Sequence, residues 1–110
     1  MKSMNTVQLI GWLGKDPEIR MTRNGKLLAK LRIATDLFVP QKDGPPKIIT
    51  TWHDVTLWRQ NQIEFFLNSL TKGSHILVDG RIEYRQYLTK KGELRKGTEI
   101  VANYLIDLDR

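Results

Sequence analysis

One ten-residue run of the sequence, residues 49–58, holds two tryptophans in a pattern suited to binding nucleotide bases. Read with the two-residue period of a strand, the run places Trp52, Thr56 and Trp58 on one face. Rings that alternate with small polar side chains make a poor core but a good wet surface for stacked bases. The rings lie six residues apart, about 20 Å along a strand, so they are expected to contact different nucleotides.

The opposite face of the same run supplies a core row. Val55 and Leu57 fall on this face, together with His53. Because this row is the better core, the tryptophans are expected to point outward. A lone histidine on such a strand is more often a packing or subunit-contact residue than a metal ligand.

The preceding strand-like run adds positive charge. Its apolar face is Ala29, Leu31 and Ile33, and its other face carries Lys30 and Arg32. If the two strands pair with these outer faces together, cations and rings share one surface. The cations would then neutralise phosphates and release counterions.

A second basic and aromatic cluster lies later in the chain. Tyr87 shares a strand-like face with arginines, and a basic turn follows. The cations expected to bind phosphate here are Arg81, Arg85, Lys90, Lys91, Arg95 and Lys96. An ordinary solvated hairpin is the alternative reading of this cluster. Phe38 falls in a predicted loop and is either a further stacking ring or a loop anchor.

Composition narrows the class of protein. The chain of 110 residues has 18 lysines and arginines against 12 acidic residues, a net charge of +6. This excess favours a polyanionic partner, nucleic acid before anionic membrane, although basic surface also aids solubility. No apolar run approaches the roughly 20 residues that span a bilayer. The N-terminus lacks a signal-peptide pattern and cysteine is absent, so we expect a cytoplasmic protein without disulfides.

Nothing in the sequence indicates catalysis. His53 and His75 are the two histidines, and neither has acidic residues or cysteines at metal-ligand spacing. Glycine-rich phosphate loops and the nucleophile elbow are absent from the sequence. We therefore expect no catalytic residue, no metal site and no cofactor, and a single-strand nuclease or deaminase is disfavoured.

The elements that must position these residues are five long strands and one helix. The strands are predicted over residues 6–13, 27–36, 49–58, 75–87 and 98–107, with an extended segment at 19–22 and a hairpin turn at Asn24-Gly25. Asn61 is expected to cap the helix and Gly73 to end it, with Ile63, Phe66, Leu67 and Leu70 as its apolar stripe. This order predicts an all-β OB-fold, a five-stranded Greek-key barrel with one short helix between strands 3 and 4.

We predict a single OB-fold domain over residues 1–110. Residues 1–4 are expected to form a flexible N-terminus, and residues 36–47 and 88–97 to form mobile loops. Gly11 and Gly80 fall where a strongly coiled strand needs a bend or a bulge.

The sequence resembles the bacterial single-stranded DNA-binding protein (SSB) family from about Asn5 to Asp107. The stretches that carry the resemblance are residues 5–20 (NTVQLIGWLGKDPEIR), 24–25 (NG), 33–35 (IAT), 51–58 (TWHDVTLW), 70–74 (LTKGS) and 78–82 (VDGRI). Each stretch is weak alone, but their joint order and spacing are specific.

The resemblance implies sequence-independent binding and protection of single-stranded DNA during replication, recombination and repair, at the nucleoid. It also implies a homotetramer around which the DNA wraps. The family's stacking rings map onto Trp52, Trp58 and Tyr87, with Phe38 near the loop position. The family's subunit contact maps onto His53.

The sequence departs from the family pattern at three places. Trp12 replaces a common polar residue and is either an extra stacking ring or a packing residue at a subunit contact. Phe38 and Val39 compete for the loop aromatic. The chain stops after residues 107–110, whereas relatives continue into a linker with an acidic tip, so tail-mediated protein partners are not expected. The alternative function is that of a tail-less paralogue of the primosomal type, a protein-interaction module.

Overall fold

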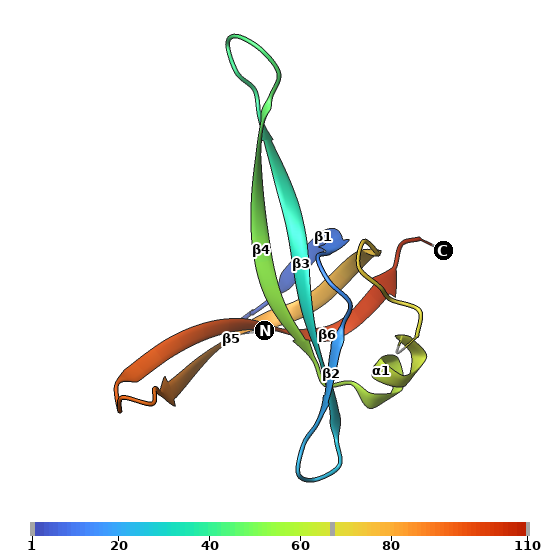
Figure 1. The fold of residues 1–110 in the computed structure, drawn as a ribbon, viewed down its shortest axis with the longest axis vertical. Coiled ribbons are helices and arrows are strands. Elements are labelled where there is room, and N and C mark those ends of the chain that lie inside the picture. Colours follow the sequence, from blue (N-terminus) through green and yellow to red (C-terminus); the bar gives the residue numbers. More distant parts are fainter. Residues whose placement is uncertain (1, 67, 110) are drawn as a thin grey trace.

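The computed structural model describes residues 2–66 and 68–109. Within them the chain forms six strands and one short helix (Figure 1). The strands are β1 (Val7–Leu13), β2 (Glu18–Met21), β3 (Leu27–Val39), β4 (Lys47–Leu57), β5 (His75–Leu88) and β6 (Leu94–Asp107), and the helix is α1 (Gln60–Phe66). The predicted extended segment at 19–22 is β2, displaced by one residue.

Five of the strands close into a barrel. The sheet order is β1-β5-β6-β4-β3-β2, and a further pairing of β1 with β3 joins the two ends of the barrel. β4 and β6 run parallel over the three pairs from Val55–Ile100 to Leu57–Ala102, whereas β1 pairs antiparallel with both of its neighbours. This is the strand order of the predicted OB-fold, with the helix in its expected place before β5.

The inward faces of the barrel strands form one hydrophobic core. Ile33, Val55 and Ile76 are at most 1 % exposed, and Ile63 and Phe66 of α1 pack against the same cluster. The apolar rows predicted for β3 and β4 are therefore confirmed. Removing these side chains from water is the main favourable contribution to folding.

Two glycines allow backbones to approach closely where the barrel strands bend. The register between β5 and β6 shifts between Asp79 and Gly80, which is the predicted bulge. A Cβ atom on Gly11 would lie 2.1 Å from the carbonyl oxygen of Ala34, on the strand that β1 meets to close the barrel. Only glycine fits at such a distance.

Both long loops are shorter than the sequence predicted. β3 continues to Val39 and β4 begins at Lys47, because Leu37 pairs with Ile49 and Phe38 with Ile48 beyond the barrel. The connection is therefore residues 40–46 rather than 36–47. In the same way β5 and β6 continue as a hairpin, leaving residues 89–93 in place of 88–97. The β3–β4 hairpin rises from the top of the barrel in Figure 1.

The helix is also shorter than predicted. The helix begins at Gln60, because the carbonyl of Arg59 accepts the first helical hydrogen bond, from the N–H of Ile63 at 3.0 Å. The side-chain amide of Gln60 also bonds the N–H and the carbonyl of Leu27 at 2.9 and 2.6 Å. The helix ends at Phe66, whose carbonyl accepts turn hydrogen bonds from the N–H groups of Ser69 and Leu70. Gly73 has a positive φ of 91° but belongs to the later connection to β5.

Leu67, assigned to the apolar stripe of the helix, lies outside the described residues. Among the residues that are described, no helix is long and apolar enough to cross a membrane.

Gly11→Ala is expected to lower the free energy of unfolding by about 1–3 kcal/mol, because the new methyl group overlaps the Ala34 carbonyl. Gly97→Ala is the matched control, since its nearest heavy atom would lie at 3.5 Å. Urea unfolding of the two variants measures the difference. Equal stability of the two variants would contradict the close approach of β1 and β3.

Candidate nucleic-acid interface

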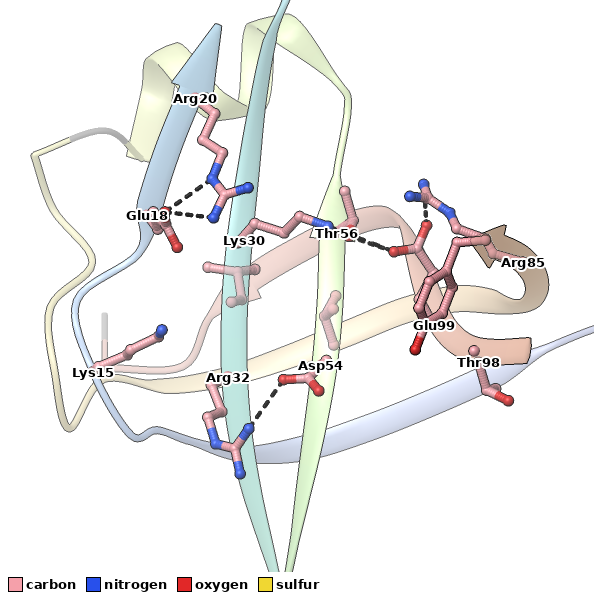
Figure 2. Close-up of a pocket in the computed structure, with 14 residues that line it drawn as sticks. Lys15, Glu18, Arg20, Lys30, Arg32, Asp54, Thr56, Arg85, Thr98 and Glu99 are labelled. Atoms are coloured by element: carbon pink, nitrogen blue, oxygen red, sulfur yellow. Dashed lines mark hydrogen bonds and ion pairs between the residues drawn. The ribbon is translucent and has the colours of Figure 1, made fainter. Parts of the chain in front are cut away.

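An open groove of about 430 Å³ crosses the outer face of β3 and β4 and reaches the β5–β6 hairpin (Figure 2). Its charged and polar lining comes from separate strands, with Lys30 and Arg32 on β3 and Arg85 on β5. We call this feature the cationic groove. The residues that line it are Lys15, Glu18, Arg20, Lys30, Leu31, Arg32, Asp54, Val55, Thr56, Arg85, Tyr87, Gly97, Thr98 and Glu99.

Four of the predicted site residues meet in the cationic groove. Lys30 and Arg32 lie on the outer face of β3, as the alternation of the strand predicted, and Arg85 and Tyr87 face them from β5. Tyr87 is 54 % exposed. The structure thus places a ring beside cations from two strands that are far apart in the sequence, and the binding role of each residue stays a prediction.

Trp52 does not line the groove, but its ring lies against Arg32, which does. Its ring is 47 % exposed, and the guanidinium of Arg32 lies 5.2 Å from the ring centroid. A Cβ atom on Gly14 would come within 2.2 Å of the ring, so the glycine leaves room for the indole. The cation and the ring attract each other through the ring quadrupole. The predicted outward direction of Trp52 is confirmed.

Trp58 lies in a second hollow rather than in the cationic groove. It follows the end of β4 and is 37 % exposed, with Lys26, Arg81 and Asn103 among its neighbours. Arg81 bonds Glu83 at 2.7 Å and the side-chain oxygen of Asn103 at 3.1 Å. The predicted outward row over residues 52–58 therefore does not line one groove: Thr56 lines the cationic groove and Trp58 the second hollow.

Thr56 lies on the predicted outer face and lines the groove, but the expectation that it is wet was wrong. The residue is 1 % exposed, because Lys30 and Glu99 cover it. The Lys30 ammonium donates to Thr56 Oγ1 at 3.1 Å, and that hydroxyl donates to Glu99 at 3.0 Å. The threonine is thus buried but fully hydrogen-bonded, as a buried polar group must be.

Glu99 is the groove residue that sequence reasoning missed. It reaches the groove because β6 runs parallel to β4, a pairing between residues far apart in the sequence. The one available signal was an acidic residue directly before the apolar run that begins at Ile100. Asp54, Glu18 and Arg20 also line the groove and were not predicted as site residues.

Four of the five cations that line the groove form ion pairs with carboxylates. Arg32 pairs with Asp54 at 3.2 Å, and Arg20 pairs with Glu18 at 2.8 Å. Lys30 and Arg85 both pair with Glu99. The groove is thus less positive than its number of arginines and lysines suggests.

The remaining predicted residues lie on the two hairpins. Phe38 is on β3, opposite Ile48, and is 62 % exposed. Lys90 and Lys91 are exposed in the turn of the β5–β6 hairpin, followed by exposed Arg95 and Lys96 on β6. They extend the positive charge away from the barrel along one hairpin.

Two histidines lie away from the cationic groove. His53 is half-buried, and its Nε2 lies 2.8 Å from the Thr35 hydroxyl. His75 stacks on the ring of Trp12, with the centroids 4.6 Å apart. Across the described residues no group of three or more histidine, cysteine or acidic side chains is placed to hold a metal ion.

Comparison with known proteins identifies the family of this chain. The model of the single-strand binding protein family matches residues 4–108. The chain belongs to this family. Two curated SSB relatives, from Neisseria meningitidis serogroups A and B, are each named single-stranded DNA-binding protein. Each is 38 % identical over 101 residues, which cover 92 % of this chain and 58 % of the relative, so the chain spans under two thirds of their length.

Solved SSB structures share the fold. An SSB from Plasmodium falciparum, in complex with ssDNA, has a TM-score of 0.84 and 31 % identity, covering 99 % of this chain and 98 % of the other. A deletion mutant of the Thermus aquaticus single-stranded DNA binding protein has a TM-score of 0.80 and 30 % identity, covering 96 % and 50 %. The predicted SSB resemblance and OB-fold are confirmed.

Trp52→Ala and Trp58→Ala are each expected to lower the free energy of unfolding by less than about 2 kcal/mol, because both rings remain exposed in the folded chain. Leu57→Ala is the comparison, since Leu57 is 1 % exposed and its loss should cost about 2–5 kcal/mol. Urea unfolding followed by circular dichroism tests all three. A tryptophan variant as unstable as Leu57→Ala would place that ring in the core.

Proposed function

We propose that this chain binds single-stranded DNA without sequence preference and covers it during replication, recombination and repair. The observation that carries the proposal is the cationic groove, where Lys30 and Arg85 lie beside the exposed ring of Tyr87. Trp52, whose ring lies against Arg32 of the groove, adds a second accessible ring. Membership of the SSB family supports the same function.

Binding would divide between rings and cations. The proposed stacking rings are Trp52, Trp58, Tyr87 and Phe38, and each stacked base contributes about 1–3 kcal/mol whatever its identity. The proposed phosphate ligands are Lys30, Arg32, Arg81, Arg85, Lys90, Lys91, Arg95 and Lys96. Stacking on protein rings requires bases that are free of a duplex, which favours a single strand.

Other features favour a single strand over a duplex. A duplex is commonly read by a helix that enters the major groove. The one helix of the described chain, α1, has seven residues and packs into the core through Ile63 and Phe66. The SSB family is DNA-binding and non-catalytic, so we propose that this chain acts without enzymatic activity or cofactor, in the cytoplasm at the nucleoid.

Oligo-dT is expected to quench the tryptophan fluorescence on binding, and affinity should fall with salt at a log–log slope of about −0.7 per phosphate neutralised. Trp52→Ala and Trp58→Ala should each weaken binding by about 1–3 kcal/mol. Titration of the fluorescence at several salt concentrations measures both effects.

Phe65→Ala is the control for these titrations. Phe65 is 62 % exposed on α1 and lines neither hollow, so its loss should leave affinity unchanged. No change of fluorescence with oligo-dT at low salt would overturn the proposed function.

We further propose that the chain assembles with itself, as a homotetramer, with His53 at a subunit contact. Ile10 of β1, Leu77 of β5 and Ile106 of β6 are cross-strand neighbours and share one face of the sheet. Ile10 is 55 % exposed and Ile106 44 % exposed. An apolar row of this kind on a sheet is typical of a surface that another subunit covers.

Light scattering should give four times the mass of one chain, and Ile10→Glu combined with Ile106→Glu should lower that mass because charges would be buried at the contact. Glu64→Gln on α1 serves as the control and should keep the tetramer. A single-chain mass for the unaltered protein would contradict the assembly. A dimer with weak DNA binding would favour the interaction module of the primosomal type.

A further inference from the structure

Glu99 is a carboxylate buried in the wall of the cationic groove. Only 11 % of its side chain is exposed. Asp54, the groove acid that pairs with Arg32, is 74 % exposed. Figure 2 shows Glu99 between Lys30, reached through Thr56, and Arg85. A carboxylate repels phosphate, so the proposed binding of DNA does not explain why a buried acid lies at this place.

Each carboxylate oxygen of Glu99 faces a different cation. Oε2 accepts from the Thr56 hydroxyl at 3.0 Å and lies 3.6 Å from the Lys30 ammonium. Oε1 lies 2.5 Å from the Arg85 guanidinium as an ion pair. Each of the two carboxylate oxygens therefore has a cation beside it.

Burial of its carboxylate makes this cluster different from the exposed pairs of the groove: Glu99 is 11 % exposed, whereas Lys30 and Arg85 are 34 % and 52 % exposed. Exposed pairs such as Arg32–Asp54 are worth little and are screened by salt. Charges held away from water are screened much less. A phosphate that approaches Lys30 or Arg85 therefore meets cations that already have a persistent counter-charge.

We propose that Glu99 is a positioning residue that acts as a built-in counter-anion, competing with DNA phosphate for Lys30 and Arg85. This inference rests on the proposed binding of single-stranded DNA. Glu99 neutralises one of the two positive charges and holds both side chains at the groove wall. Fewer phosphates are then neutralised and fewer counterions leave the DNA on binding, so the affinity is lower and less dependent on salt than the number of cations implies.

A purely structural role makes a different prediction. The hydrogen bond from Thr56 to Glu99 connects β4 to β6 beside the parallel pair Thr56–Val101. In a purely structural role, Glu99 would stabilise the fold through this hydrogen bond, and its charge would not matter. Glu99→Gln keeps an acceptor for Thr56 and removes only the charge. A structural role thus predicts an unchanged salt dependence for this variant.

The test is titration of the full chain with oligo-dT across salt concentrations. Glu99→Gln is expected to bind more tightly at low salt, with a log–log slope steeper by about 0.7 for each cation that newly engages a phosphate. Glu64→Gln carries the same change of net charge on the exposed face of α1 and should keep the slope of the unaltered protein. An unchanged or shallower slope for folded Glu99→Gln would overturn the proposal.

A second comparison holds even if Glu99→Gln fails to fold. Lys30 and Lys90 are both proposed phosphate ligands, but Lys90 has no ion-pair partner within the described residues. Lys90→Gln should make the slope shallower by about 0.7, and Lys30→Gln by clearly less. Equal changes would overturn the role of Glu99. Absence of any oligo-dT binding by the unaltered protein would instead overturn the proposed function.

Discussion

The parallel pairing of β4 with β6 is the constraint on which the groove depends. It covers three residue pairs, Val55–Ile100 to Leu57–Ala102, and joins the β1–β4 half of the chain to the β5–β6 hairpin. It brings Lys30 of β3, the neighbour of β4, to the same groove as Arg85 of β5, the neighbour of β6. Val55 and Leu57 are buried on the inner face of this strand pair. The paired strands thus contribute to the core with one face and to the groove with the other.

That shared origin explains why polar groups are buried at the groove wall. The outward side of a barrel strand is normally wet, yet Thr56 is covered because β6 lies so close. Its hydroxyl must then find partners, and Lys30 and Glu99 supply them. Two features of the surface, a buried hydroxyl and a charge cluster, thus follow from the closure of the barrel.

Alternation along single strands was predictable from the sequence, and contacts between strands were not. The inward direction of Leu31 and Val55 and the outward direction of Trp52 follow from the two-residue period alone. The place of Glu99 depends on which strand lies beside β6, which local pattern does not specify. The helix start was misplaced for a similar reason, since Gln60 is fixed by bonds to Leu27, 33 residues earlier.

The loop boundaries show the limit of turn signals. Prolines and glycines between residues 40 and 46 indicated a loop, and the flanking residues seemed part of it because their side chains cover no core. Backbone pairing continues there regardless, between Phe38 and Ile48 for example. The backbone pairing of two strands can continue for a few residues beyond the last side chains that contribute to the core.

The β3–β4 hairpin has a consequence for how the family can vary in length. Successive side chains on a strand point to opposite faces, so Leu37 and Phe38 lie on different sides of this ribbon. Adding one residue to each strand near the barrel would exchange the two faces and turn Phe38 away from the side of Trp52. Insertions of two residues per strand would lengthen the hairpin and keep every ring on its own side.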